Sequence, residues 1–221
     1  MAIGKSQSNM TKQWLGRISY SAGITLQNDA VQQRRNEQIP DTVFMLEHDP
    51  VYTIGRTRDK SSLNEASGKL PYPVFETNRG GQATYHGPGQ LIGYPVIDLR
   101  SYGQDLHTYL RSLERALVDS CSKFGVASTT REGFTGVWCD DKKIASIGIG
   151  VRHWISMHGF AINVCGDLAP FEHITPCGIG GVKMTSVSQE SGREINLEEF
   201  AAVTFRSLQN ELTILRKTAL E

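Results

Sequence analysis

The stretch ITPCGIGG, residues 174–181, places a cysteine on a loop rather than inside an apolar strand or helix. Pro176 stiffens the chain before Cys177, and the glycines that follow remove side-chain bulk and leave backbone N–H groups open to a ligand. Such a thiol suits an acyl acceptor, with the loop amides available to an oxyanion. Because a free cysteine has a pKa of about 8.5, it needs a cationic neighbour to be a good nucleophile at neutral pH. The alternative is a structural cysteine in a tight turn.

A lysine pair in WCDDKKIASIGIGVRHW, residues 138–154, offers one such cation. Asp140-Asp141 predicts a hairpin turn, and side chains on the strand that follows alternate between its two faces. Lys143 then lies on the more apolar face with Ala145, Ile147, Ile149 and Val151, whereas Lys142 shares the other face with Ile144, Ser146 and Gly148. A lysine on an apolar face loses hydration, which favours its neutral amine unless an anion is near, as a general base or the partner of a thiolate requires. The alternative is that Lys143 extends along the sheet edge to solvent.

A glycine-rich stretch, RGGQATYHGPGQLIGYPVIDL at residues 79–99, is the third place that indicates chemistry. Glycine allows the backbone to approach a ligand closely, and the polar residues between the glycines could orient its carbonyl or amide groups. The pattern is neither GxGxxG nor a P-loop, so it predicts no dinucleotide or nucleotide phosphate site. A tight hairpin whose glycines serve only the turn is the alternative.

Three histidines compete with Lys143 for the activating role. His86 lies in the glycine-rich stretch, His158 precedes a glycine, and His173 lies four residues before the candidate nucleophile. Because cysteine–histidine pairs are common among thiol enzymes, spacing alone does not decide between lysine and histidine.

The other cysteines, Cys121, Cys139 and Cys165, form no CxxC pair with each other or with Cys177. Neither a disulfide framework nor a structural zinc site is therefore predicted. Most of these cysteines are expected to be small buried hydrophobic residues.

The composition predicts a mid-sized enzyme or binding protein of the cytoplasm. Its 221 residues, with equal numbers of acidic and basic side chains, carry a formal net charge of zero, and the pI is near 7.0. This balance argues against a broad electrostatic hold on nucleic acid, although local basic patches could serve an acidic protein partner. No apolar run is long enough to span a membrane, and no signal-peptide pattern opens the chain.

Hydrophobic periodicity predicts the elements that must position these residues. The strongest helix signals are residues 105–125 and 195–215, and residues 21–40 indicate a third helix ended by Pro40. Strands are predicted over residues 14–20, 42–48, 51–55, 136–151 and 155–164, with a polar surface loop over residues 57–73. Short strands flanked by a few helices favour an α+β or α/β domain built on a mixed sheet.

Taken together, these stretches resemble the lipoyl(octanoyl) transferase family, the octanoyl-acyl-carrier-protein:protein octanoyltransferases. The resemblance rests on the glycine-rich stretch, on GVWCDDKKIASIGIGVRHWISMHGFAINV at residues 136–164 and on ITPCGIGGVKMTS at residues 174–186, in that order; EHDPVYTIGR at residues 47–56 fits as well. It covers nearly the whole chain from about Trp14 onward. We therefore expect a flexible tail over residues 1–13 and one catalytic domain over residues 14–221.

The resemblance implies a role for each matching residue. Cys177 would become an acyl-thioester, and Lys143 would favour its thiolate. His173 falls where the family varies, which argues against it as the base, and Cys139 lies outside the pattern. Substrate contacts would fall on Arg79, Gly80, Gly81, Gln82, Ala83, Thr84, Tyr85, His86, Ser146, Ile147, Gly148, Gly159, Phe160 and Ala161. The implied fold is α+β, a mixed β-sheet flanked by helices as in the biotinyl and lipoyl protein ligase catalytic domain.

The implied activity is an acyl transfer of lipoate biosynthesis. An octanoyl group would pass from octanoyl-acyl carrier protein to a specific lysine of lipoyl domains, those of the 2-oxoacid dehydrogenases and the glycine cleavage H protein, without metal, cofactor, nucleic acid or membrane. An ATP-dependent lipoate or biotin protein ligase, which shares the implied fold, is the main alternative. A cysteine-dependent amidase or thioesterase and a non-catalytic module that binds acyl carriers or lipoyl domains are two others.

Overall fold

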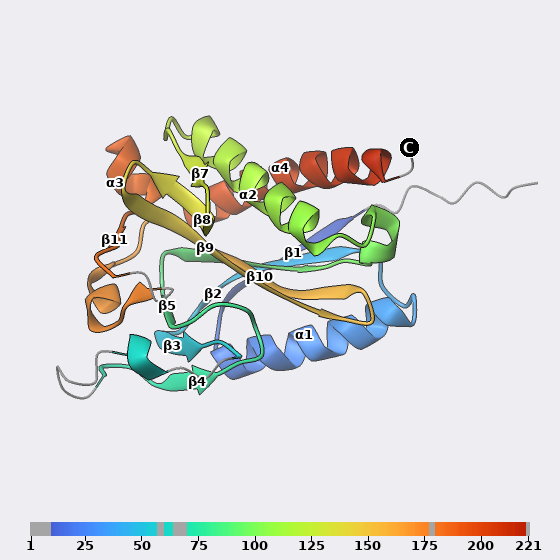
Figure 1. The fold of residues 1–221 in the computed structure, drawn as a ribbon, viewed down its shortest axis with the longest axis horizontal. Helices are drawn as coiled ribbons and strands as arrows, with labels where there is room; N and C mark the ends of the chain where they lie inside the picture. The colour runs from blue at the N-terminus through green and yellow to red at the C-terminus, as the bar shows by residue number, and fades with distance from the viewer. Residues whose placement is uncertain (1–9, 57–59, 64–69, 177–179, 220–221) are drawn as a thin grey trace, which may run out of the picture.

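A mixed β-sheet carries the fold. The computed structural model describes residues 10–56, 60–63, 70–176 and 180–219 (Figure 1). The sheet has the order β1-β2-β6-β10-β9-β8-β7, and a short eighth strand, β11, pairs with β9. Two of its pairings, β1 with β2 and β11 with β9, are parallel, and the others are antiparallel. The strands are β1 (Thr11–Ile18), β2 (Thr42–His48), β6 (Gln90–Val96), β7 (Thr129–Arg131), β8 (Phe134–Cys139), β9 (Lys142–Arg152), β10 (Ile155–Asn163) and β11 (Lys183–Met184).

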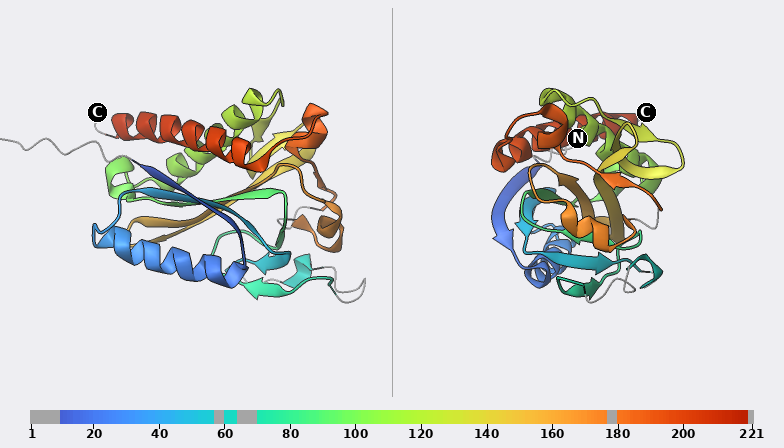
Figure 2. Two further views of the ribbon diagram at one scale, coloured as in Figure 1. Left: turned by 180° about the vertical axis from the view of Figure 1, so that it is seen from behind. Right: turned by 90° about the vertical axis from the view of Figure 1, so that its left-hand side faces the viewer.

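A smaller sheet and the helices cover the two faces of the large sheet. Figures 1 and 2 show α2 (Leu106–Lys123) and α4 (Leu197–Thr218) on one side, and α1 (Tyr20–Arg35) with the small sheet on the other. The small sheet has the order β4-β3-β5, from β4 (Val74–Glu76), β3 (Val51–Ile54) and β5 (Thr84–His86). The remaining elements are the helix α3 (Val187–Ser191) and the 3₁₀ turns η1 (Lys60–Ser62), η3 (Leu99–Tyr102) and η4 (Ala169–His173). This arrangement confirms the α+β class, a mixed sheet flanked by helices.

The main core lies between the large sheet and the helix pair α2–α4. The predicted apolar face of α2, with Leu113 and Leu117 fully buried, packs there against Phe200 and Leu208 of α4. Asp105 caps the start of α2 by accepting a hydrogen bond from the His107 N–H (2.9 Å). A cap of this kind satisfies an N–H group that the first turn of a helix leaves unpaired. None of the helices in the described ranges combines the length and apolar character that crossing a bilayer requires.

Several predicted boundaries are wrong, among them both ends of the first strand and the end of the first helix. The first strand begins at Thr11, so residues 11–13 belong to the sheet and not to the expected tail; the Thr11 N–H donates to the Asp41 carbonyl, and Thr11 Oγ1 lies 3.0 Å from Thr42 Oγ1. Backbone pairing with a neighbouring strand thus overrides the polar composition that suggested a tail. Residues 1–9 lie outside the described ranges. The first helix ends at Arg35, well before Pro40, because the chain enters the left-handed region at Glu37 (φ 58°).

A buried carboxylate holds that helix end to the sheet. Asp41 is 1 % exposed, and it accepts hydrogen bonds from Arg34 Nε (2.7 Å), the Asp98 N–H (3.0 Å) and Tyr102 Oη (2.9 Å). It therefore joins α1, β2 and η3 at one point. Removal of a buried charge with this many partners is costly, because the partner groups remain buried and lose their hydrogen bonds.

We expect Asp41→Ala to lower the free energy of unfolding by about 3 kcal/mol, since the largely buried guanidinium of Arg34 loses its nearer carboxylate and keeps only Asp98, at 3.7 Å. Urea denaturation measures the change. Asp141→Ala serves as the control, because Asp141 pairs with Arg131 while its own side chain is 91 % exposed, and such a pair contributes at most about 1 kcal/mol. Equal losses in the two variants would contradict this account of Asp41.

Candidate active site

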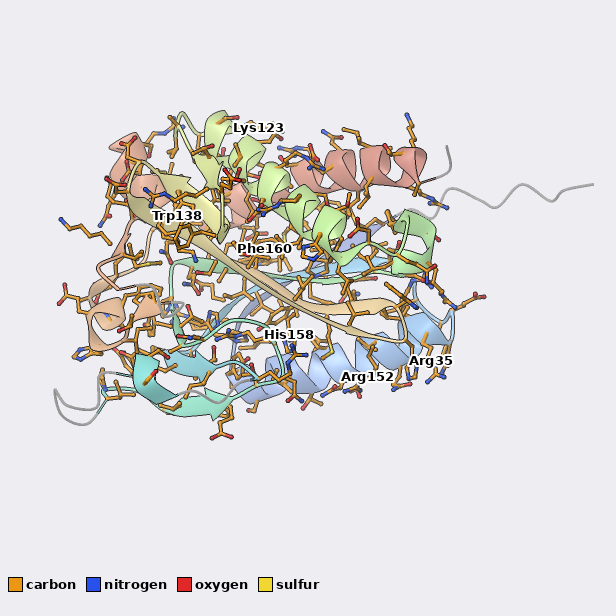
Figure 3. All side chains as sticks on the ribbon, viewed as in Figure 1. Arg35, Lys123, Trp138, Arg152, His158 and Phe160 are labelled. Carbon is orange, nitrogen blue, oxygen red and sulfur yellow. The ribbon has the colours of Figure 1, made fainter. Side chains whose placement is uncertain are left out.

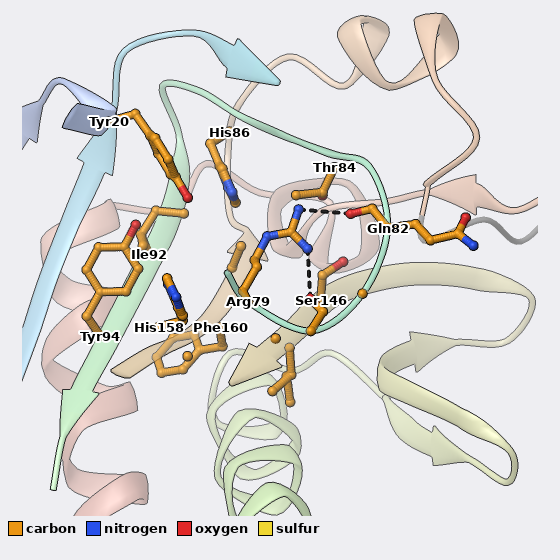
Figure 4. A pocket seen from close by; sticks show the side chains of 16 residues that line it. Tyr20, Arg79, Gln82, Thr84, His86, Ile92, Tyr94, Ser146, His158 and Phe160 are labelled. Carbon is orange, nitrogen blue, oxygen red and sulfur yellow. Dashed lines mark hydrogen bonds between the residues drawn. The ribbon is translucent and has the colours of Figure 1, made fainter. Parts of the chain in front are cut away.

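A pocket opens between β9 and β10 of the large sheet, the glycine-rich loop and the start of α1 (Figure 4). Its empty volume, including the open mouth, is about 520 Å³. The residues that line it are Tyr20, Arg79, Gly80, Gly81, Gln82, Thr84, His86, Ile92, Tyr94, Ser146, Ile147, Gly148, His158, Gly159, Phe160 and Ala161. The fold thus brings together three stretches that are far apart in the sequence.

All the predicted substrate contacts line this pocket except Ala83 and Tyr85. On β5 the side chains of Thr84 and His86 face the pocket, so Tyr85 between them points to the opposite face. There it packs edge-on against Phe171, with ring centroids 5.5 Å apart. Ala83 is fully buried in the same small cluster. The strict alternation of a strand excludes these two side chains from the pocket.

Four residues of the lining were not among the predicted contacts. Ile92 and Tyr94 alternate on β6 within the glycine-rich stretch, and His158 directly precedes the predicted contact Gly159, so the sequence around these three residues did point to the pocket. His158 was considered only as an activator of the thiol. Tyr20, at the start of α1, is far from every motif in the sequence, and only the packing of α1 against the sheet brings it there.

Arg79 holds the glycine-rich loop in place. Its Nη2 atom donates to the carbonyl oxygen (2.9 Å) and Oγ1 (2.7 Å) of Thr53 and to the Gln82 carbonyl (2.9 Å), and its Nη1 donates to the Gly80 carbonyl (2.9 Å). A Cβ atom on Gly55 would lie 1.8 Å from the Gly81 carbonyl oxygen, so only glycine permits the backbones to approach this closely. The guanidinium therefore shapes the loop from within.

Two buried histidines, His86 and His158, line the pocket, and a third, His48, lies behind the lining residue Tyr94. Nδ1 of His48 lies 3.0 Å from the Ile18 carbonyl oxygen, which can only accept, so Nδ1 carries the proton and Nε2 accepts from Tyr94 Oη at 2.7 Å. By the same reasoning His86 donates from Nδ1 to Gln90 Oε1 at 2.8 Å. Burial lowers the pKa of His48, and it lowers the pKa of His86 to about 3 and of His158 to about 4. All three are neutral at physiological pH.

A chain of buried hydrogen bonds continues from His86 to the strand that carries Lys143. Gln90 Nε2 donates to Asn163 Oδ1 (2.9 Å), and Asn163 Nδ2 donates to the Thr185 carbonyl (3.0 Å). The Thr185 N–H in turn donates to the Lys143 carbonyl (3.0 Å). The pocket and the backbone around Lys143 are thus fixed relative to each other through side chains on β6 and β10.

Lys143 is 1 % exposed, which confirms its predicted burial and excludes the alternative that it reaches solvent. Its ammonium lies over the ring of Trp138, 5.3 Å from the ring centroid. Lys142, by contrast, is half-exposed and forms an ion pair with Glu190. The predicted alternation of faces is only partly right, because Ile144 is fully buried as well. A register shift between β8 and β9 interrupts the alternation at this point.

Cys177 lies outside the described residues, but both of its flanks are placed. Upstream, the Thr175 N–H donates to the Ser62 carbonyl (2.7 Å), and Ile174 bridges to Leu63. Ser62 and Leu63 are buried, so this part of the predicted surface loop over residues 57–73 is interior: its backbone pairs with the segment that leads to Cys177. Downstream, β11 pairs with β9 so that Met184 lies opposite Lys143.

The remaining candidates take no part in the pocket. Burial raises the pKa of Cys121 to about 11 and of Cys139 to about 12, so both stay protonated. Cys165 is exposed, so it departs from the buried role expected for most of these cysteines; it follows the end of β10 near the surface. His173 is exposed on η4. Across the described ranges, no three histidine, cysteine, aspartate or glutamate side chains gather as metal ligands.

Comparison with known proteins places the chain in a family. Residues 19–209 match the family model of the lipoyl protein ligase A/B catalytic domain. The octanoyltransferase of Geobacter sulfurreducens is 47% identical over 188 residues, which cover 85% of this chain and 78% of that protein. That of Citrifermentans bemidjiense is 46% identical over 199 residues, which cover 89% and 95%.

Solved structures share the fold at low sequence identity. A lipoate protein ligase from Thermoplasma acidophilum superimposes with a TM-score of 0.66 over 92% of this chain and 83% of that one, at 16% identity. A biotin protein ligase from Aquifex aeolicus gives a TM-score of 0.58 over 94% and 71%, at 10% identity.

The fold and the matched residues define a lipoyl protein ligase A/B catalytic domain, and this chain belongs to that family. Within it, the chain belongs with the octanoyltransferases and is an acyltransferase.

The buried neutral histidines predict a loss of stability in mild acid. From the ordinary histidine pKa of 6.5 down to the folded value of about 3, the unfolded chain binds a proton at His86 that the folded chain does not. Lowering the pH through this window therefore favours unfolding, by about 1.4 kcal/mol per pH unit for each such histidine once its unfolded form is fully protonated.

The free energy of unfolding, measured by urea denaturation from pH 7 to pH 5, should therefore fall less steeply with falling pH in His86→Gln. We expect the difference in slope to approach about 1.4 kcal/mol per pH unit at the acid end of this range. His173→Gln, which removes an exposed histidine instead, is the matched control. An unchanged slope in His86→Gln would show that His86 does not remain neutral in the folded state.

Proposed function

We propose that the protein transfers an octanoyl group from octanoyl-acyl carrier protein to a lysine of lipoyl domains through an acyl-thioester on Cys177. The observation that carries this proposal is the buried Lys143. It lies opposite β11, which follows the Cys177 loop within a few residues, and on the strand that lines the pocket with Ser146, Ile147 and Gly148. A cation held there suits the partner of a thiolate.

The first half-reaction loads the enzyme. The thiolate of Cys177 attacks the carbonyl carbon of the octanoyl thioester, the bond from that carbon to the carrier's sulfur breaks, and the ammonium of Lys143 donates a proton to the departing thiolate. Exchange of one thioester for another is close to neutral in free energy. N–H groups of the glycine-rich Cys177 loop are the candidates to hold the oxyanion.

The second half-reaction transfers the chain to the acceptor. The free amine of the acceptor lysine attacks the acyl-Cys177 carbonyl, an amide forms and the bond to Cys177 breaks. Lys143, now neutral, takes the proton that the amine loses, which restores the starting state. Aminolysis of a thioester runs downhill, so the cycle consumes no ATP. The acceptors proposed are the lipoyl domains of 2-oxoacid dehydrogenases and the glycine cleavage H protein.

The pocket supports an acyl chain as the transferred group. Ile92, Ile147, Phe160 and Ala161 supply apolar walls, whereas the Arg79 loop closes one side with backbone groups. A slot with mostly apolar walls and a few fixed polar groups is typical of sites for small, largely apolar ligands.

Intact-mass spectrometry after mixing with octanoyl-acyl carrier protein should show one added octanoyl group, mapped to Cys177 and absent from Cys177→Ala. Subsequent addition of a lipoyl domain should remove that group without ATP. A requirement for ATP would instead favour the ligase alternative, and release as free octanoate in the presence of the acceptor would favour a thioesterase.

Lys143→Ala should slow alkylation of Cys177 by iodoacetamide at pH 7 by about tenfold or more, since the thiolate loses its cation. Lys142→Ala, one residue away and paired with Glu190, is the matched control and should alkylate at the wild-type rate. An unchanged rate in Lys143→Ala would remove the proposed role of Lys143.

A further inference from the structure

Trp138 lies directly across the strand pair from Lys143. The two residues are register partners on β8 and β9, and the indole is 1 % exposed. Figure 3 labels Trp138 among the side chains of this end of the sheet. With the Lys143 ammonium 5.3 Å from the ring centroid, the negative face of the indole is within reach of the cation. Trp is the aromatic residue whose face attracts a cation most strongly.

The indole is held by its neighbours rather than by a hydrogen bond of its own. The Arg131 guanidinium lies 5.0 Å from the ring centroid, and the Phe134 ring packs edge-on at 6.0 Å. Buried tryptophan usually finds a hydrogen-bond partner for its N–H group, yet the Nε1 atom of Trp138 has none within the part of the chain that the structure describes. The described contacts of the Trp138 ring are therefore made through its face and edge and not through its N–H group.

The chain leaves room for the lysine on its other side. A Cβ atom on Gly136 would lie 2.4 Å from the Ala145 carbonyl oxygen and 2.8 Å from Cε of Lys143, so glycine at this position admits both the neighbouring backbone and the lysine side chain. The Gly136 N–H donates to Glu114 Oε1 at 2.8 Å, and that carboxylate, fully buried on α2, also accepts from Arg111. Trp138 and Gly136 therefore border Lys143 on one strand.

Charged groups surround this pair from several elements. Glu114 on α2 reaches it across Gly136, Arg131 on β7 stacks on the indole, and the Lys142–Glu190 pair joins β9 to α3 beside it. The indole face is in direct contact with the Lys143 ammonium. A cation buried to this degree is unstable unless groups around it replace its lost hydration.

We propose that Trp138 is a positioning residue that stabilises Lys143 as the ammonium and holds its nitrogen against the indole face. The proposal rests on the function proposed above and has two consequences there. A charged Lys143 favours the Cys177 thiolate at neutral pH. It also protects the loaded enzyme, in which Lys143 has given up its proton. An indole that holds the Lys143 nitrogen against its own face keeps the neutral amine from attacking the octanoyl thioester; in such an attack the carbon–sulfur bond would break, an amide to Nζ would form, and the proton of the amine would pass to the Cys177 sulfur.

The experiment compares Trp138→Phe, which keeps a weaker aromatic face, with Trp138→Leu, which keeps only apolar bulk. Trp14→Leu, the same change at a partly buried tryptophan that packs against the main core from β1, is the matched control. Thermal unfolding of each variant comes first. Should Trp138→Leu fail to fold, Trp138→Phe carries the test alone.

The first readout is the rate of Cys177 alkylation as a function of pH. We expect the midpoint of the profile to rise by about half to one pH unit in Trp138→Leu and by less in Trp138→Phe, with a three- to tenfold slower rate near pH 7, about the strength of a buried cation–π contact. Trp14→Leu should keep the wild-type midpoint. A Trp138 variant that loses stability but keeps its midpoint would overturn the proposal, because packing alone does not move a titration.

The second readout is the fate of the loaded enzyme. After incubation with octanoyl-acyl carrier protein, peptide mass spectrometry should find a hydroxylamine-resistant octanoyl group on Lys143 in Trp138→Leu, several-fold more than in the wild type or Trp14→Leu. Equal amounts in all three would overturn the protective part of the proposal. Lys143→Ala in the same assays separates the two proposals. If it alkylates like the wild type, the role proposed for Lys143 in the acyl transfer fails; slow alkylation in Lys143→Ala with a normal midpoint in Trp138→Leu refutes only the role of Trp138.

Discussion

Burial of one ammonium group is the constraint on which the rest of this site depends. Removing a lysine head group from water costs several kcal/mol even after the protein relaxes. The structure places Lys143 there nonetheless, at 1 % exposure, between an indole face and a glycine that admits its side chain. A buried apolar residue in this position would stabilise the fold at least as well as the buried lysine does. It is the arrangement expected where a charge serves chemistry.

The architecture keeps this strand rigid from both sides. Helices α2 and α4 cover one face of the sheet with the main core, and α1 with the small sheet covers the other (Figure 2). The pocket forms on the second side, where the Arg79 loop meets β9 and β10. The buried chain through Gln90 and Asn163 then links the pocket to Thr185, next to Lys143. The pocket and the strand segment that carries Lys143 thus share one scaffold of strands.

Relatives of the fold use the same framework for different chemistry. The lipoate and biotin protein ligases superimpose on this chain at 10% to 16% identity, which shows a shared arrangement of strands and helices and no more. What separates an acyl transferase from its structural neighbours lies in a few side chains on that arrangement. In the proposed function these are the lysine buried on β9 and Cys177, the cysteine of the loop before β11. The fold therefore shows which proteins are structurally related to this one, whereas the side chains of the site decide which reaction it catalyses.

Much of the fold follows from local pattern. The apolar periodicity of α2 and α4 predicted both helices, because burial of one face decides it. Apolar pattern also predicted β2, β3, β9 and β10, but it predicted neither the central strand β6 nor the short strands β4, β5, β7 and β11. Boundaries were less accurate where polar residues pair through the backbone, as at Thr11, or where the chain leaves a helix before a proline, as at Glu37. Neither event leaves a clear mark in residue type.

Residue types and their order made the glycine-rich loop, Lys143 and Cys177 candidates, since loops without side-chain bulk and lysines in apolar strands are uncommon combinations. They did not decide between Lys143 and a histidine as the activating group, and the role of Cys177, which lies outside the described residues, stays a prediction. Tertiary structure alone decided the rest. Strand alternation turned Tyr85 away from the pocket, a register shift buried Ile144 beside Lys143, and the packing of α1 brought in Tyr20. It also put the indole of Trp138 against the ammonium. Each of these contacts joins segments that are far apart in the chain or lie on paired strands. The spacing of residues along the sequence does not show which faces of strands and helices will pack against each other.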